Sequence, residues 1–337
     1  MDWRGKLSHH GQLGGIETAV LDNGPGRGTR IAWVNTGSPL RYKVAIDRGL
    51  DIVDAFYGAH ALAWLSRAST AAPHPAAPRG IEWLRSFNGG LLTTCGPSHV
   101  GPPESDDAGS RGLHGNASNT PAELTLVEQP DPERGRTAMA LGGIVRDTPL
   151  FGPQLELRRT IRGELGRAEL RVEDSITNRG NEPAPHMLLY HCNLGFPLVD
   201  EGAKLTWKGK TRSRGQAEDD RIFASDHDYR TCPAPMNQHA GAREACAFIV
   251  PEPDDDGRAR VGVANPALRL TIEIEFDPTR LPCLTNWQHW GPGEYVTALE
   301  PGTHYPIGQN AARRDGTLVM LEPGETRDYE LTVRAEL

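Results

Sequence analysis

One glutamate and two histidines stand at the ends of short apolar runs, where their side chains could carry out acid–base chemistry. Glu300 closes an apolar run that starts at Tyr295, and Pro301 follows it. His191 lies in a second run of this kind, and His114 precedes a glycine in a third. A carboxylate that accepts a proton and an imidazole that donates one are the groups needed for proton transfer on a small neutral molecule.

Each of these residues also has a purely structural interpretation. Glu300 could be a solvated carboxylate at a strand end, His114 could stabilise a turn, and His191 could be a core histidine bonded to backbone. His191 and Asn193 share a face if their run is a strand, because side-chain direction repeats every two residues. We therefore expect both to line one cleft.

A metal site is the main chemical alternative. His114, His191 and Glu300 could together form a two-histidine, one-carboxylate site. The spacing of the histidines, however, gives no strong ligand motif. We therefore expect no catalytic metal and no cofactor.

Three further residues are candidates for binding the ligand. Trp287 could be an aromatic platform for the apolar face of a sugar ring, or a tryptophan at the edge of the core. Arg48 and Asp51 could grip hydroxyl groups by charge-assisted hydrogen bonds, or form an internal ion pair. Arg48 is the only fixed cation among the candidates, and Asp51 is near enough in sequence to neutralise it. A neutral, non-phosphorylated ligand is expected.

The sequence pattern predicts that the elements that position these residues are strands. Apolar and polar side chains alternate over residues 168–172, 268–276 and 329–337, which is the period of a half-buried strand. Thirty-eight glycines and 27 prolines favour many turns, and no segment sustains an apolar period of 3.6. The pattern predicts an all-β fold, a large antiparallel β-sandwich in one domain over residues 1–337. The irregular stretch 97–112 ends beside His114 and could form a rim or lid.

Composition excludes several classes of partner. The net charge is −8, with 36 basic and 44 acidic residues and no basic block, which argues against nucleic acid and against a membrane surface. No apolar stretch approaches eighteen residues, and no signal peptide is visible after Met1. Five scattered cysteines without a Cys-x-x-Cys pair are typical of reduced thiols, so we expect a cytoplasmic protein.

The three short segments that contain His114, His191 and Glu300, in this order along the chain, resemble the aldose 1-epimerases, or galactose mutarotase-like proteins. Residues 299–301 are similar to the Leu-Glu-Pro motif of that family, and residues 113–115 are similar to its His-Gly motif. Residues 191–195 are similar to its mid-chain histidine motif, but the motif here is two residues shorter. A closer resemblance is to an uncharacterised, DUF4432-like branch of these proteins, and it is carried by residues 47–52, 62–64, 89–96 and 189–195.

This resemblance implies a galactose mutarotase-like supersandwich and a small-molecule sugar as partner. It also implies that Glu300 is the base, that His191 is the acid, and that His114 assists by binding or polarising the sugar. The reaction would be epimerisation at the anomeric carbon, and a homodimer is compatible with it. We expect the three side chains to converge on one cleft, with a gap of about one sugar ring between His191 and Glu300.

Two other functions use the same residues. One is a non-catalytic carbohydrate-binding protein on the same fold, since a fold does not determine a function. The other is an isomerase or epimerase of keto-sugars that uses the same acid–base pair.

Overall fold

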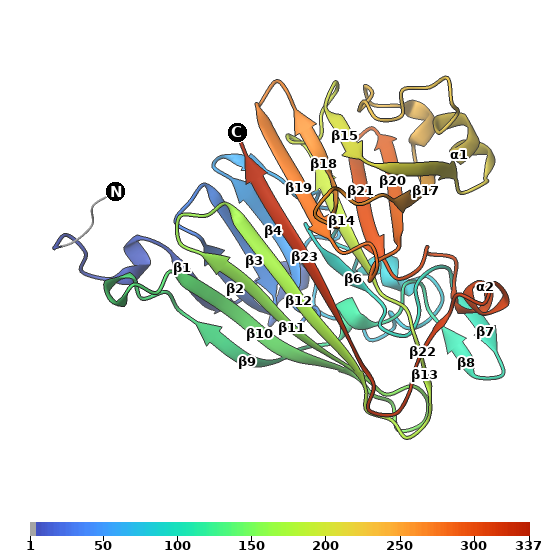
Figure 1. The fold of residues 1–337 in the computed structure, drawn as a ribbon, viewed down its shortest axis with the longest axis horizontal. Helices are drawn as coiled ribbons and strands as arrows, with labels where there is room; N and C mark the ends of the chain where they lie inside the picture. The colour runs from blue at the N-terminus through green and yellow to red at the C-terminus, as the bar shows by residue number, and fades with distance from the viewer. Residues whose placement is uncertain (1–4) are drawn as a thin grey trace.

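The computed structural model describes residues 5–337, which form an extensive, mostly antiparallel β structure (Figure 1). The largest sheet has eight strands in the order β15-β18-β19-β23-β12-β11-β10-β9. Their bounds are β9 (Glu123–Glu128), β10 (Ala138–Asp147), β11 (Leu155–Glu164), β12 (Glu169–Asn178), β15 (Lys204–Trp207), β18 (Ala259–Asn265), β19 (Leu270–Phe276) and β23 (Thr326–Glu336). The three runs of alternating residues predicted as strands lie in β12, β19 and β23, so the all-β prediction is confirmed.

A six-stranded and a five-stranded sheet lie edge to edge. The six-stranded sheet has the order β16-β17-β20-β21-β14-β6, and the five-stranded sheet runs from β1 to β5. Single bridges join the two sheets, from Ile52 to Leu92 and from Ala63 to Leu194. The bounds are β1 (Gly15–Val20), β2 (Arg30–Asn35), β3 (Leu40–Ala45), β4 (Asp51–Tyr57), β5 (His60–Ala61), β6 (Thr93–Cys95), β14 (Leu189–Gly195), β16 (Gly209–Ser213), β17 (Ala245–Pro251), β20 (Cys283–Gly291) and β21 (Glu294–Gly302).

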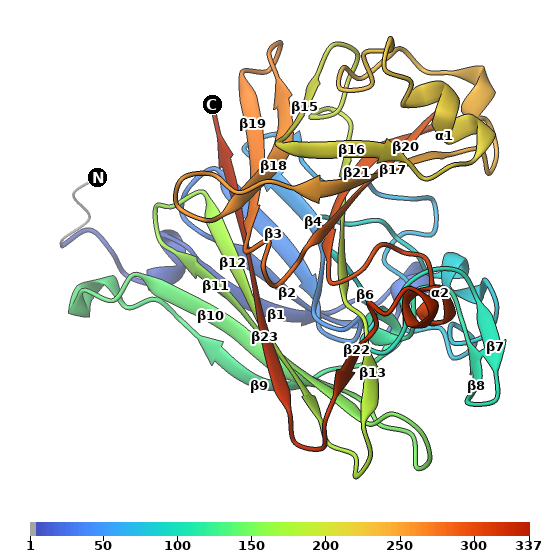
Figure 2. The ribbon, with the colours of Figure 1, turned by 45° about the vertical axis from the view of Figure 1, so that its right-hand side comes forward.

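Short elements surround the six-stranded sheet. The segment between β16 and β17, residues 214–244, contains α1 and lies near one end of this sheet, while β7, β8 and α2 lie together near the other (Figure 2). The stretch 97–112 is thus less irregular than expected, because the hairpin β7–β8 occupies part of it. The bounds are β7 (Glu104–Asp106), β8 (Gly109–Arg111), β13 (Ala184–His186), β22 (Val319–Leu321), α1 (Ala217–Ile222) and α2 (Gln309–Arg314), with 3₁₀ turns at His10–Gln12, Gly24–Gly26, Glu82–Arg85, Ala117–Asn119, Pro132–Arg134 and Asn237–His239.

The core between the layers contains a buried charge network centred on Arg159 of β11. Its guanidinium donates to both oxygens of Asp174, at 2.8 and 2.6 Å, and to Thr94 Oγ1 at 2.8 Å. Tyr190 donates to the same aspartate at 2.8 Å, and Asp51 lies 3.5 Å from Arg159 Nη1. These residues come from all three sheets, so the network fixes the sheets relative to one another from inside.

Candidate active site

Adjacent strands bring Glu300 and His191 into contact. In the antiparallel pair β14–β21, Cys192 lies opposite Leu299, so His191 faces Glu300 one position further along. Tyr190, Cys192 and Leu299 belong to the core, and alternation therefore turns His191 and Glu300 to the outer face of the sheet. The two side chains meet there with 3.3 Å between His191 Nε2 and Glu300 Oε1, and both are largely buried.

This contact corrects one expectation. A gap of about one sugar ring between His191 and Glu300 was predicted, and that prediction is wrong. Residues directly opposite each other on neighbouring strands are held about 5 Å apart, which leaves no room for a ring between their side chains. A ligand must therefore lie over the pair, and both groups must reach it from the same side.

His114 approaches from a loop. Its ring lies 6.0 Å from the ring of His191, at 87° to it. His114 and Gly115 both have positive φ, of 58° and 73°, and a side chain on Gly115 would meet the carbonyl oxygen of Gly96 at 2.6 Å. A non-glycine residue in the left-handed region is strained, and such residues gather at functional sites. The glycine after His114 is thus required by this turn.

Four aromatic side chains surround the pair. Phe87 and Trp287 lie 5.2 and 5.5 Å from the His191 ring, and Trp64 lies 6.0 Å from Trp287. Trp83 stacks on Phe87 at 4.5 Å. Trp64, Phe87 and Trp287 are half-buried, so they present ring surface at the rim of the site. The roles of Trp64, Trp83 and Phe87 were missed, because no local pattern in residues 62–92 indicates which aromatics face the site.

A chain of charged groups orients Trp287. The indole Nε1 donates to Glu244 Oε2 at 2.7 Å, and Arg214 Nη1 donates to Glu244 Oε1 at 2.8 Å. Arg214 also makes two hydrogen bonds with Asp219, at 2.9 and 3.0 Å. No local sequence pattern predicts these contacts, since Arg214 and Glu244 are far apart in the sequence and only the fold brings them together.

Burial keeps the site uncharged. It lowers the pKa of His191 to about 4. The pKa of His114 is lowered to about 3 by burial and, to a smaller extent, by the nearby His191. Burial also raises the pKa of Glu300 well above its ordinary value, and the charge of Glu244 raises it further. At neutral pH the imidazoles are therefore neutral, and the raised pKa of Glu300 favours a proton on its carboxyl group, which can pass to His191 across their contact.

Several polar atoms at the site form no hydrogen bond within residues 5–337. They include Nδ1 of His114, Nδ1 of His191 and Oγ1 of Thr285, which lies opposite Glu300 on β20. Buried polar atoms without partners are costly. A ligand with several hydroxyl groups would satisfy them.

The structure does not bring Arg48 and Asp51 into this site. Arg48 is buried and donates to the carbonyl oxygens of Ser118, Ala71 and Ser86. Asp51 accepts hydrogen bonds from the amide and the hydroxyl of Thr94 in the buried network. Their expected contact with ligand hydroxyls is therefore not available, and the ion pair of Asp51 is with Arg159 instead of Arg48.

Asn193 shares the face of His191 but lies deeper. Its amide nitrogen donates to the carbonyl oxygens of Gly90, at 3.1 Å, and of His191, at 2.9 Å, and the residue is fully buried. These bonds hold the backbone that carries His191. They occupy its amide nitrogen, while its Oδ1 forms no hydrogen bond within residues 5–337.

Two kinds of feature are absent from residues 5–337. No group of three or more His, Cys, Asp or Glu side chains is arranged to hold a metal ion. None of the helices in these residues is long and apolar enough to cross a membrane.

Comparisons with known proteins identify the fold. A family model described as a domain of unknown function, DUF4432, matches residues 26–335. A Klebsiella pneumoniae protein provisionally assigned as an aldose 1-epimerase superposes with a TM-score of 0.81 at 23% identity, over 95% of this chain and 83% of its own. A galactose mutarotase-like protein from Clostridium acetobutylicum gives 0.66 at 10% identity, over 96% and 99%. No curated protein matches the sequence. The fold is thus that of the galactose mutarotase-like β-sandwiches.

Proposed function

The chain belongs to the DUF4432 family, and we propose that it interconverts the two anomers of a neutral sugar or sugar derivative at Glu300 and His191. One observation carries this proposal: a carboxyl group and an imidazole lie 3.3 Å apart in a site rimmed by aromatic rings. This pair can accept one proton and donate another, which is the requirement of the reaction.

The contact between the two groups suits the geometry of the anomeric carbon. The anomeric hydroxyl and the ring oxygen are bonded to the same carbon, so two side chains placed side by side can reach both. The shared proton first passes from Glu300 to His191 across their 3.3 Å contact. Glu300 then accepts the hydroxyl proton while His191 delivers its proton to the ring oxygen. The bond from the anomeric carbon to the ring oxygen breaks, and the aldehyde forms. Rotation of the aldehyde and reversal of these steps close the ring on the other face.

The remaining groups bind the sugar. The half-buried faces of Trp287, Trp64 and Phe87 can stack on its C–H surface, and His114 can hydrogen-bond a hydroxyl group. Arg214, which is linked to Trp287 through Glu244, is already bonded to Asp219 and Glu244, so it offers little to a phosphate. A neutral ligand therefore suits the site.

The test is anomer exchange measured by saturation-transfer NMR in D₂O on a panel of neutral aldoses. We expect faster exchange between the α and β signals of at least one sugar, with retention of the proton on C2. Loss of the C2 proton would instead indicate isomerisation of a keto-sugar. Binding without any exchange would indicate a carbohydrate-binding protein.

The pH dependence of the exchange rate follows from the shifted pKa values. Below pH about 4, His191 takes up a second proton, and the pair can no longer accept one from the sugar. At high pH Glu300 loses the shared proton, and this loss is displaced upward because burial raises its pKa. We expect a bell-shaped profile with its acid limb near pH 4, measured after subtraction of the uncatalysed rate at each pH. An acid limb at the ordinary pKa of histidine would contradict this assignment.

Substitutions of Glu244 distinguish its effect on the pKa of Glu300 from its effect on the orientation of Trp287. Glu244→Gln removes the negative charge that raises the pKa of Glu300 but keeps an acceptor for the indole, so the alkaline limb should move to lower pH. Glu244→Ala should also release Trp287 and raise KM by about tenfold, the scale of a lost hydrogen bond to a charged group. If the two variants have the same KM and the same pH profile as the unmodified protein, Glu244 does not orient Trp287.

The same proposal includes a cytoplasmic setting and a single domain. All five cysteines are free thiols, and Cys95, Cys192, Cys232 and Cys246 are buried. Free thiols are typical of reducing compartments.

A further inference from the structure

The outer face of the five-stranded sheet carries a second group of polar and aromatic side chains. In this sheet, Trp33 of β2 lies opposite Lys43 of β3, which lies opposite Asp54 of β4. In the next row, Arg41 of β3 lies opposite Phe56 of β4. The residues that alternate with them on β2 and β3, such as Val34 and Tyr42, belong to the core.

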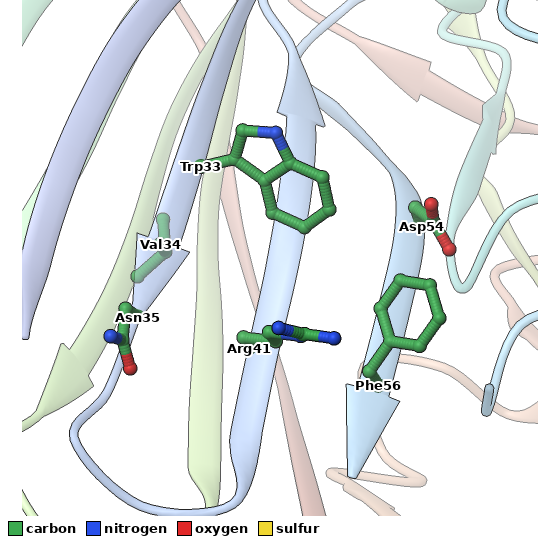
Figure 3. A pocket seen from close by; sticks show the side chains of 6 residues that line it. All are labelled: Trp33, Val34, Asn35, Arg41, Asp54 and Phe56. Atoms are coloured by element: carbon green, nitrogen blue, oxygen red, sulfur yellow. The ribbon is translucent and has the colours of Figure 1, made fainter. Parts of the chain in front are cut away.

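These side chains enclose a hollow of about 430 Å³ (Figure 3). It is lined by Trp33, Val34, Asn35, Arg41, Asp54 and Phe56. A second hollow of about 500 Å³ adjoins it, since Trp33 and Asn35 line both. Gly15 lies opposite Asn35 on β1 and lines the second hollow together with Gln129. The indole of Trp33 thus stands between two hollows on one surface.

Asp54 is the polar group that indicates a ligand. The residue is only 6% exposed, and its Oδ1 accepts no hydrogen bond within residues 5–337. Its Oδ2 lies 3.4 Å from Lys43 Nζ. A buried carboxylate oxygen without a donor is costly, so a hydroxyl group supplied by a ligand would stabilise it.

Arg41, Trp33 and Phe56 supply hydrogen-bond donors and aromatic surface that suit a sugar ring. The Arg41 guanidinium lies 5.1 Å from the Phe56 ring centroid and has neither an ion pair nor a hydrogen bond within the described residues. Its N–H groups are therefore available to hydroxyl oxygens. Trp33 and Phe56 have their centroids 6.5 Å apart, and Lys43 Nζ lies over the Trp33 ring at 4.7 Å from its centroid. The ring surface not covered by Lys43 and Arg41 can contact C–H groups. Lys43 offsets the charge of Asp54, so this carboxylate does not need a cationic group from the ligand.

We propose that this face is a second carbohydrate-binding site, in which Asp54 accepts a hydrogen bond from a pyranose hydroxyl, Arg41 donates to its oxygens and Trp33 contacts its ring. The site is separate from Glu300 and does not depend on any chemistry there. Three strand spacings, from β3 through β4 and β6 to β14, place it about 15 Å from His191. One monosaccharide cannot contact both sites.

The test follows the indole N–H signals of the ¹⁵N-labelled protein, which has seven tryptophans. The signal that Trp33→Phe removes is that of Trp33. Methyl β-galactopyranoside, methyl α-glucopyranoside and the methyl glycoside of galacturonic acid are titrated separately, because their rings cannot open. The Glu300→Gln/His191→Asn variant is titrated in parallel to remove the first site.

We expect the Trp33 signal to shift with at least one of these glycosides, equally in the unmodified protein and in the Glu300→Gln/His191→Asn variant. Asp54→Asn and Arg41→Met should each weaken this binding about tenfold. Phe151→Ala, which removes an aromatic side chain that is 87% exposed, should leave it unchanged. A response to the galacturonide alone would identify an acidic sugar as the ligand.

Three results would overturn the proposal. One is the lack of any shift at saturating concentrations of all three glycosides. The second is a shift that disappears in the Glu300→Gln/His191→Asn variant, since it would then originate at the first site. The third is a fall in sedimentation mass caused by Trp33→Phe without sugar binding, which would show that a second copy of the chain covers this face.

Discussion

Glu300→Gln should lower the rate of anomer exchange by at least ~100-fold, the usual scale for loss of a general base. The amide has nearly the same shape as the carboxyl group but can neither take the proton of the anomeric hydroxyl nor share one with His191. Burial already disfavours a charge at this position, so the variant should fold normally. The measurement is the exchange rate by saturation-transfer NMR, with circular dichroism as the check of folding.

The control is Glu252→Gln, a matched change at an exposed glutamate just after β17, which should exchange at the unmodified rate. His191→Asn should be as slow as Glu300→Gln. The double variant should be little slower than either, because groups that act as one unit lose most of their effect together. A folded Glu300→Gln protein that keeps nearly full turnover would remove Glu300 from the mechanism.

The second large effect concerns stability. Arg159→Met should lower the free energy of unfolding by about 3–5 kcal/mol, because it leaves Asp174 buried without its partner. Adding Asp174→Leu should restore part of this loss, since the second substitution removes the unpaired charge. Urea unfolding followed by fluorescence measures the difference.

Arg162→Met is the matched control for this experiment. Arg162 lies on the same strand and pairs with Glu173 at 2.8 Å, but the side chains are 47% and 36% exposed. An exposed pair contributes about 0–1 kcal/mol. Equal destabilisation by Arg159→Met and Arg162→Met would show that the buried network does not hold the sheets together.

The strands were predictable because their evidence is local. Alternation over residues 268–276 reflects one face against the core and one against solvent, and it identifies β19 without knowledge of its partners. The same rule correctly places His191 and Asn193 on one face of β14. It does not reveal burial: Asn193, expected at the ligand, is fully buried, with its amide nitrogen bonded to backbone.

The contacts across the fold were not predictable in the same way. The register that sets His191 opposite Glu300 joins strands about a hundred residues apart, and no local pattern fixes it. The partner of Asp51 was mistaken for the same reason. Arg48 is its neighbour in sequence, but Arg159 on another sheet is its neighbour in space. Sequence spacing predicts ion pairs on one element far better than pairs between sheets.

The way in which Trp287 is held has a consequence for how specificity can diverge. Its indole lies on the six-stranded sheet, but its orientation depends on Glu244 and Arg214, which belong to the connecting segment 214–244. Connecting segments tolerate insertion and replacement far better than strands do. Relatives could therefore acquire new ligand preferences by exchanging this segment, while the strands that carry Glu300 and His191 stay unchanged.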